Sequence, residues 1–315
     1  MKRVILQNTD LELSNVCYGT GNFGEKLSEE ESFAVLDAFV LAGGNFIDTA
    51  NVYCKWVPGL SNCSEQYIGK WLKERNAYHK VVIATKGGHY DFNAPGISRV
   101  NKKGILEDLE ESLTSLGLDH IDFYWLHRDD ENKPIGEIID IMEDLKSKGK
   151  IRYYGASNYS LERMKEAKAY AKEKGIQGFS AVSNQWSMAK VNPGSNLNSD
   201  KSLVLMNEDY YQWHKESKMP IIPYSSSGNG YFQKRDKGIA MTEKLRDAYD
   251  NEINDENFKK LKELSKEKNE SVFSLSIAWL LNQPFQVFPI VSVSKLEQLP
   301  DFIRASEIEM PKEEF

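Results

Sequence analysis

A short run of apolar residues followed by an amphipathic stretch recurs eight times along the 315-residue chain. Each run is four to eight residues long and rich in Ile, Val, Phe and Tyr, which is typical of a strand buried on both faces. The runs lie at residues 15–19, 45–48, 80–86, 120–127, 151–155, 179–184, 220–224 and 286–293. Alternating strands and helices form parallel βαβ units, and eight such units in about 300 residues predict a closed (β/α)8 barrel.

The segments around these runs complete the predicted architecture. Residues 4–6 and 11–13 flank a polar turn and predict a small N-terminal β-hairpin. After the seventh run, the connection at 226–256 is long for a βα loop, so we expect a lid or a disordered segment there. No linker rich in Pro, Gly or Ser divides the chain, so residues 1–315 are expected to form one domain.

Charge and cysteine content limit the partners and the compartment. The chain has 40 Lys and Arg against 47 Asp and Glu, a net charge of −7, which argues against a nucleic-acid partner. The longest apolar stretch, at 277–281, is far too short to span a membrane, and the N-terminus lacks a secretory pattern. The three cysteines, Cys17, Cys54 and Cys63, are therefore expected to be reduced thiols in a cytoplasmic protein. The oligomeric state stays open.

Polar side chains stand at the carboxyl end of every run after the first. In a β/α barrel these ends lie on one face, where active sites form. The residues are Asp48, Lys86, His127, Ser157–Asn158, Asn184–Gln185, Tyr224–Ser225 and Ser292–Lys295. The pattern predicts one site assembled from nearly the whole chain.

Four of these polar residues and their neighbours form a chemically coherent set. A phenol is a poor acid at neutral pH, with a reference pKa of about 10. At about 4 Å and an effective dielectric of about 20, the Lys86 ammonium attracts a Tyr53 phenolate by about 4 kcal/mol, or about three pKa units before desolvation is subtracted. This shift would bring Tyr53 into the range of general acid–base catalysis. Asp48 is expected to hold Lys86 charged, and His127 to orient a carbonyl oxygen or share the proton transfer.

Taken singly, each of the four also fits a structural role. Asp48 fits a turn cap, Tyr53 a loop aromatic, Lys86 a solvated strand end and His127 a satisfied core histidine.

Several segments resemble motifs of the aldo-keto reductase superfamily, in the same order along the chain. Residues 45–53 (NFIDTANVY) resemble the segment with the catalytic aspartate and tyrosine, and residues 81–86 (VVIATK) resemble the lysine strand. Residues 116–127 (LGLDHIDFYWLH) resemble the histidine signature, and residues 149–158 (GKIRYYGASN) resemble the strand whose Ser-Asn pair holds the nicotinamide amide. The resemblance extends from about residue 15 to residue 299.

The resemblance implies hydride transfer from NADPH to a carbonyl carbon. It implies that Tyr53 protonates the carbonyl oxygen with help from Lys86 and Asp48, while His127 orients the carbonyl. The cofactor contacts expected from it are Gly19, Thr20, Ser157, Asn158, Gln185, Tyr224, Ser225, Ser292, Ser294, Lys295 and Gln298.

The segment after the eighth run departs from the family pattern. The family usually shows a Pro-Gly or Pro-Lys turn followed by a basic residue, whereas residues 289–295 here are PIVSVSK, and Phe302 stands near the position of a family asparagine. Ser292, Ser294 and Lys295 offer two hydroxyls and one ammonium to a 2′-phosphate, without the guanidinium that suits a phosphate best. NADP(H) is the expected cofactor, with NAD(H) left open.

Residues 19–24 (GTGNFG) match the glycine pattern of a dinucleotide-binding turn. In that fold the helix opens at the glycines, with its N-terminus on the pyrophosphate. Here a capping box at Ser28–Glu31 predicts that the helix begins four residues after Gly24, so we reject a Rossmann site. The histidines form no H-x-H or H-x-x-x-H pair and no G-x-S-x-G elbow occurs, so no metal and no serine nucleophile are expected.

The loops after the strands contain the candidate substrate contacts Trp56, His89 and Arg128. Together they would form a polar pocket with one flat apolar wall, which suits a small polar or sugar-like carbonyl substrate.

Two other functions are compatible with the same barrel. A cofactor-bound redox sensor or accessory subunit would show little turnover, and an isomerase or aldolase would use Lys86 as a Schiff base. A pure binding module has no need of a phenol beside an ammonium, so the pairing of Tyr53 with Lys86 favours the reductase.

Overall fold

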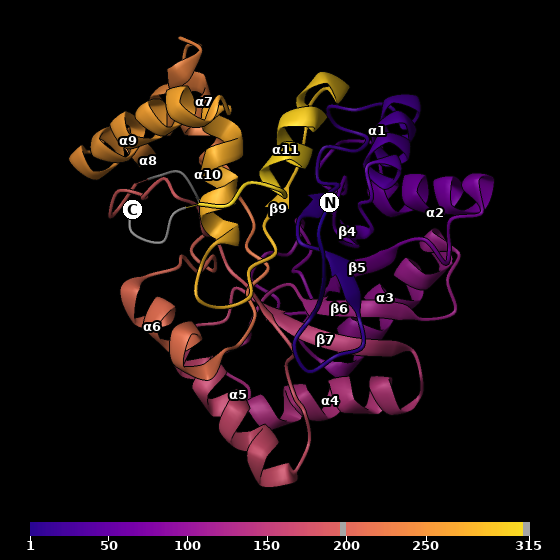
Figure 1. The fold of residues 1–315 in the computed structure, drawn as a ribbon. Helices are drawn as coiled ribbons and strands as arrows, with labels where there is room; N and C mark the ends of the chain where they lie inside the picture. The colour runs from indigo at the N-terminus through magenta and orange to yellow at the C-terminus, as the bar shows by residue number, and fades with distance from the viewer. Residues whose placement is uncertain (196–199, 311–315) are drawn as a thin grey trace.

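Seven parallel strands form one curved sheet in the computed structural model, which describes residues 1–195 and 200–310 (Figure 1). They are β3 (Cys17–Gly19), β4 (Phe46–Asp48), β5 (Val82–Gly87), β6 (Ile121–Leu126), β7 (Ile151–Ser157), β8 (Val182–Ser183) and β9 (Ile290–Val291). Each strand overlaps one predicted apolar run, and the sheet order is β8-β7-β6-β5-β4-β3-β9.

The seventh predicted run, residues 220–224, closes the sheet without forming a regular strand. Ile221 forms parallel bridges to Val182 on one side and to Val287 on the other. The Ile222 amide donates to the Val182 carbonyl at 2.8 Å, and the Ile290 amide donates to the Pro223 carbonyl at 2.9 Å. The segment thus joins β8 to β9, and the fold is the predicted (β/α)8 barrel.

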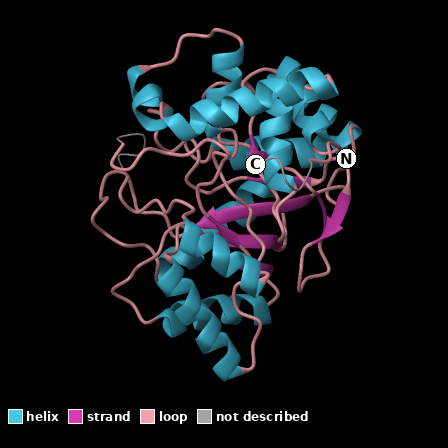
Figure 2. Cartoon of the chain, turned by 60° about the vertical axis from the view of Figure 1, so that its left-hand side comes forward, coloured by secondary structure: helices cyan, strands magenta, loops and turns pink. Residues whose placement is uncertain are grey.

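A helix follows each of the strands β3 to β8 along the chain. These helices are α1 (Glu29–Leu41), α2 (Cys63–Arg75), α3 (Lys102–Leu116), α4 (Ile135–Ser147), α5 (Leu161–Lys174) and α6 (Glu208–Ser217). The predicted capping box is present, because the Ser28 hydroxyl accepts from the Glu31 amide and the Glu31 carboxylate accepts from the Ser28 amide. The helices pack their apolar faces around the strands, which lie at the centre of the molecule (Figure 2).

The N-terminal hairpin is present as predicted. Strands β1 (Arg3–Ile5) and β2 (Glu12–Ser14) pair in antiparallel fashion. Leu6, Leu11 and Leu13 are buried and belong to the same apolar cluster as Phe123 and Phe288 of the barrel. The hairpin therefore contributes to the apolar core inside the barrel.

The segment at 226–256 is ordered, so the expectation of a disordered segment is wrong, and the expectation of a lid stays a prediction. It folds into η1 (Gly228–Gly230), α7 (Tyr231–Asp236), α8 (Glu243–Tyr249) and the first turn of α9 (Glu252–Lys268). Side chains such as Phe232, Leu245, Tyr249 and Leu261 form an apolar cluster of their own with α10. Figure 1 shows α7, α8 and α9 grouped beside α10.

The last elements return to the barrel. They are α10 (Val272–Leu281), η2 (Leu296–Gln298) and α11 (Leu299–Ala305). Phe302 of α11 is fully buried, and its ring stacks with that of Phe39 on α1. Among residues 1–195 and 200–310, no helix has the length and apolar character needed to cross a membrane.

Candidate active site

Three neighbouring strands bring Asp48, Lys86 and His127 to one end of the barrel. Asp48 ends β4, Lys86 lies one residue before the end of β5, and His127 directly follows β6. The strands are parallel and in register, with Asp48 opposite Ala84 and Lys86 opposite Trp125. The carboxyl ends of parallel strands meet on one face, so the three side chains converge there with Tyr53 from the loop after β4.

The Lys86 ammonium is the centre of this group. It donates to the Asp48 carboxylate, to the Thr49 carbonyl at 2.7 Å and to the Tyr53 hydroxyl at 3.3 Å. An ammonium has three N–H groups, so all of its donors are used and its position is fixed. Asp48 and Lys86 are 1% and 3% exposed, which places the ion pair out of contact with solvent.

Burial has the largest effect on the pKa values of Asp48, Lys86 and Tyr53. Burial raises the pKa of Asp48, and Lys86 offsets this only in part. Burial lowers the pKa of Lys86, but Asp48 and Tyr53 raise it by more, so the ammonium stays charged. Burial also raises the pKa of Tyr53, and the opposing effect of Lys86 is smaller. The expected lowering of the Tyr53 pKa is therefore wrong, because desolvation outweighs the ion pair.

A neutral imidazole completes the tetrad, the name used below for Asp48, Tyr53, Lys86 and His127. The His127 ring centroid lies 6.2 Å from that of Tyr53 and 4.9 Å from that of His89. Burial, followed by the charges of Arg128 and His89, lowers the pKa of His127 well below its usual value. Its Nδ1 atom has no hydrogen-bond partner in the described part of the chain.

Asn158 connects four segments beside the tetrad. It has φ of 61°, and its amide group donates to the His127 carbonyl at 3.3 Å. Its side-chain oxygen accepts from the Tyr224 hydroxyl at 2.6 Å and from the Val204 amide at 3.1 Å. The neighbouring Ser157 hydroxyl donates to the Ser183 carbonyl at 2.9 Å. These contacts place two of the expected cofactor residues, Asn158 and Tyr224, next to His127.

Other expected cofactor residues on the last strands lie in two groups. Gln185 forms parallel bridges to Leu205 and Tyr224, and Ser225 has φ of 53°. The Ser292 hydroxyl donates to the Gly19 carbonyl at 2.7 Å. Gln298 accepts from the Ser294 amide at 2.8 Å, and Lys295 is exposed beside them.

Gly19 and Thr20, at the end of β3, are involved in contacts with neighbouring strands. A Cβ at Gly19 would approach Ile290 Cγ2 to 2.6 Å, so the close contact with β9 requires glycine there. Thr20 is fully buried, and its hydroxyl donates to the Asp48 carbonyl at 3.0 Å. The following glycines do not open a helix, because α1 begins at Glu29. This agrees with the rejection of a Rossmann site.

The expected substrate residues surround the tetrad. The Trp56 ring lies 5.8 Å from the Tyr53 ring, and Trp56 Nε1 donates to Glu25 at 3.2 Å. Burial and then Arg128 lower the pKa of His89 to about 4.

Sequence reasoning missed Phe92, Tyr90 and Asp200. With Trp56, His89 and Arg128, these residues form the wall beside the tetrad. Phe92 packs against Trp56 and His89, and Asp200 accepts from Arg128 at 2.9 Å. These residues lie in loops without periodicity, so no local pattern marks them.

Cys54 and Cys63 form a disulfide, and Cys17 is a buried free thiol. The expectation of three reduced thiols is therefore wrong, and it no longer supports a cytoplasmic location. Two cysteines nine positions apart have no signature, because their approach depends on how the loop after Tyr53 folds back onto α2. Among the described residues, no group of His, Cys, Asp or Glu is arranged to hold a metal ion.

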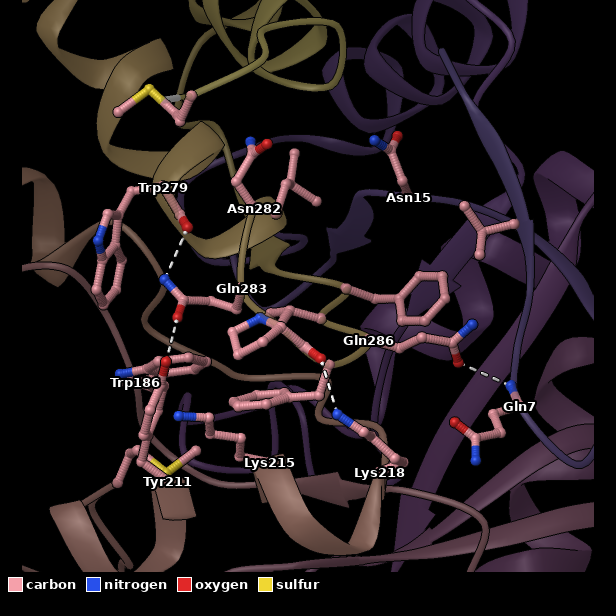
Figure 3. A pocket seen from close by; sticks show the side chains of 18 of the residues that line it. Gln7, Asn15, Trp186, Tyr211, Lys215, Lys218, Trp279, Asn282, Gln283 and Gln286 are labelled. Atoms are coloured by element: carbon pink, nitrogen blue, oxygen red, sulfur yellow. Dashed lines mark hydrogen bonds between the residues drawn. The ribbon is translucent and has the colours of Figure 1, made fainter. Parts of the chain in front are cut away.

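A cavity shown in Figure 3 lies away from the tetrad. Its volume is about 990 Å³, and none of the four tetrad residues lines it. Gln283 crosses it, donating to the Trp279 carbonyl and accepting from the Tyr211 hydroxyl (Figure 3). A second cavity of about 410 Å³ is lined by Lys86 and His89. We place the candidate active site by the chemistry of the tetrad and not by the volume of either cavity.

Comparisons with known proteins identify the family of the chain. The sequence model of the Aldo/keto reductase family matches residues 15–315. The chain is 29% identical to the uncharacterized oxidoreductase YrpG of Bacillus subtilis, over 99% of this chain and 93% of that protein. It is 27% identical to norsolorinic acid reductase B of Dothistroma septosporum, over 99% of this chain and 79% of that protein.

A solved structure shares the fold. The thermostable aldo-keto reductase Tm1743, in complex with the inhibitor epalrestat, matches with a TM-score of 0.72 and 21% identity, covering 100% of this chain and 97% of its own. Since the family model covers nearly the full length, the chain belongs to the aldo/keto reductase family of oxidoreductases.

Proposed function

We propose that the protein reduces an aldehyde or ketone to an alcohol with NADP(H), using Tyr53 as the general acid. The observation that carries this proposal is the Lys86 ammonium, which is bound to both the Asp48 carboxylate and the Tyr53 hydroxyl. The name of norsolorinic acid reductase B agrees with reduction as the reaction.

Each tetrad residue has a distinct task in this proposal. The raised pKa of Tyr53 keeps the phenol protonated at neutral pH, so it holds the proton that the carbonyl oxygen needs. The Lys86 ammonium then stabilises the phenolate that remains, and Asp48 keeps the ammonium charged. Neutral His127 offers a nitrogen to orient the carbonyl. General acid catalysis of this kind contributes roughly 10²–10⁴ in rate.

The residues beside the tetrad fit a nicotinamide cofactor, which supplies the hydride when bound. Tyr224 offers a half-buried aromatic ring, held by its hydrogen bond to Asn158, and Ser157, Asn158 and Gln185 supply polar groups around it. Because the candidate contacts run from Gly19 to Gln298, we also propose that the chain acts as one barrel domain.

Positive charge for the phosphates comes from three lysines. Lys295 is exposed beside Ser292 and Ser294. Burial and then the charge of Lys26 lower the pKa of Lys234 of α7. These lysines support NADP(H), and a titration of NADPH against NADH in wild type and Lys295→Met decides the preference.

Substitution of Tyr53 tests the proposed acid. We expect Tyr53→Phe to reduce the consumption of NADPH with a reactive aldehyde by at least a hundredfold, while NADPH affinity stays within threefold. Tyr170→Phe is the matched control, because it removes an exposed hydroxyl on α5 that donates to Asp140 at 2.8 Å. Retention of most of the rate in Tyr53→Phe would show that another group is the acid.

The wall around the tetrad supports a small polar or sugar-like carbonyl substrate. Trp56 offers a flat apolar surface, and His89 and Arg128 offer polar groups. A panel of carbonyl compounds tests this, since bulky apolar ketones should react more slowly than sugar-derived carbonyls. Binding of NADPH without turnover of any compound would instead support the redox sensor or accessory subunit.

A further inference from the structure

Asp200 ties together three loops at the carboxyl end of the barrel. It lies between β8 and α6, and one carboxylate oxygen accepts from Arg128 at 2.9 Å and from the Tyr90 hydroxyl at 3.0 Å. The other oxygen accepts from the amide and the hydroxyl of Ser202. Arg128 directly follows His127, so the ion pair stands one residue from the tetrad.

Arg128 is a buried cation with part of its binding capacity unused. It is 9% exposed, and one guanidinium nitrogen donates to the His127 carbonyl at 2.8 Å. Its Nε atom is buried and has no partner in the described part of the chain. A buried guanidinium needs an opposite charge, and Asp200 supplies it.

The ion pair also lies next to the substrate wall. The Tyr90 ring centroid is 4.2 Å from that of His89, which in turn lies 4.9 Å from that of His127. His89 and Tyr90 line the same cavity as Lys86. A charge on Arg128 that was not neutralised would therefore be felt by a ligand in front of His127.

We propose that Asp200 determines substrate specificity by neutralising Arg128, so that the pocket accepts neutral polar carbonyls and rejects carboxylates. The proposal rests on the proposed function and adds a selection by charge. A carboxylate in the pocket lined by His89 and Tyr90 would be repelled by the charge of Asp200, which accepts from Tyr90, and would not be attracted by Arg128, whose charge Asp200 offsets. Neutral ligands would be unaffected by this repulsive element. Removal of Asp200 exposes the charge of Arg128 and reverses the preference.

Binding of a matched pair of ligands tests this proposal directly. Benzoate and benzamide share a ring and differ in charge, and calorimetry at low ionic strength with saturating NADP+ gives the affinity of each. In Asp200→Asn we expect benzoate to bind at least tenfold more tightly, about 1.4 kcal/mol, while benzamide changes less than twofold. Asp200→Ser repeats the test with a smaller side chain, and thermal unfolding confirms that each variant is folded.

Two controls show whether Asp200 acts by neutralising the charge of Arg128 or only by holding the loops together. Asp119→Asn removes the same charge at the exposed residue before β6, at the opposite end of that strand, and should leave both affinities unchanged. Asp200→Asn combined with Arg128→Gln should lose the gain for benzoate.

Four results overturn the proposal. They are benzoate affinity that stays unchanged in Asp200→Asn, a gain that benzamide shares, a gain that survives Arg128→Gln, and the absence of binding by either ligand. Consumption of NADPH with a neutral aldehyde is measured separately on the wild type, so failure of the proposed reaction is distinguished from failure of this proposal.

Discussion

The two halves of the barrel are built differently. Strands β5, β6 and β7 are six, six and seven residues long and pair along continuous parallel ladders. On the other side, β8 and β9 have two residues each, and residues 220–224 between them form only isolated bridges. The tetrad lies on and beside the regular strands, whereas Gln185, Tyr224 and the Ser292–Gln298 segment lie on the irregular side.

This difference matches what each side has to hold. Reacting groups must keep their separation within a fraction of an ångström, and a continuous ladder fixes Lys86 opposite Trp125 and Asp48 opposite Ala84. The proposed cofactor is long and needs contacts spread along its length, which Gln185 and Tyr224 would supply from an irregular backbone. Substitutions on the regular side should therefore affect kcat, and those on the irregular side should affect cofactor affinity.

Loss of the Lys86 ammonium should have the largest effect. Lys86→Met removes the charge that stabilises a Tyr53 phenolate and leaves Asp48 buried without its partner, so we expect kcat to fall about 10³-fold. Steady-state kinetics with NADPH and an aldehyde measure this. Lys55→Met is the control, because that half-buried ammonium pairs with Glu111 and contacts no tetrad residue. Loss of less than tenfold in Lys86→Met would contradict the regular side as the site of chemistry.

The disulfide tests whether a loss of stability next to Tyr53 leaves the chemistry of the regular side unchanged. Cys63→Ser should lower the free energy of unfolding by roughly 2–3 kcal/mol, because the closed loop between Cys54 and Cys63 no longer restricts the unfolded chain. Denaturant titration measures this, and kcat should change by less than threefold since the Lys86 contacts remain. Wild type in the presence of dithiothreitol should match the variant. If dithiothreitol lowered the stability of wild type and Cys63→Ser equally, its effect would not come from reduction of the Cys54–Cys63 disulfide.

Asn158, which directly follows β7 and holds Tyr224 of the irregular side, should show the opposite pattern. Asn158→Ala removes the partner of the Tyr224 hydroxyl, so we expect the Kd for NADPH to rise about tenfold with a smaller change in kcat. The variant also places alanine at φ of 61°, which costs stability by itself. Asn76→Ala is the matched control, with alanine at φ of 47° at the C-terminal cap of α2. Equal effects on NADPH affinity in both variants would show that backbone strain is the cause.

The strands of the barrel and the face on which the candidate site lies could be predicted from the sequence. The apolar runs indicated the strands, and the polar residues at their ends indicated one face, because both signals depend on short-range order. The pKa of Tyr53 was predicted in the wrong direction, since its pairing with Lys86 can be inferred from motifs but its burial depends on the whole fold. Asp200 and the Cys54–Cys63 pair depend on loops that meet only after folding. The charged residues of α7 and α8 concealed helices that bury an apolar cluster of their own.

A further expected effect concerns the pH dependence of stability. Burial and Arg128 lower the pKa of His89 to about 4, below the value of about 6.5 for an exposed histidine. Between these values the unfolded chain binds more protons, so His89 contributes fully above about pH 6.5 and stability falls as pH decreases toward 4. His89→Phe should reduce the slope of unfolding free energy against pH by up to about 1.4 kcal/mol per pH unit in this window.

Denaturant titrations at several pH values measure this slope. His79→Phe, at an exposed position before β5, should leave it unchanged. A slope that His89→Phe does not alter would show that this histidine becomes protonated in the folded protein.

The disulfide has one more consequence. Cys54 directly follows Tyr53 and Cys63 begins α2, so residues 55–62 form the body of a small covalent ring that carries Trp56. Both ends of this ring stay anchored whatever sequence lies between them. The sequence between the two cysteines, which forms part of the proposed substrate wall, can therefore be exchanged or lengthened. Even after cleavage of this segment by a protease, the disulfide keeps the chain on either side joined next to Tyr53.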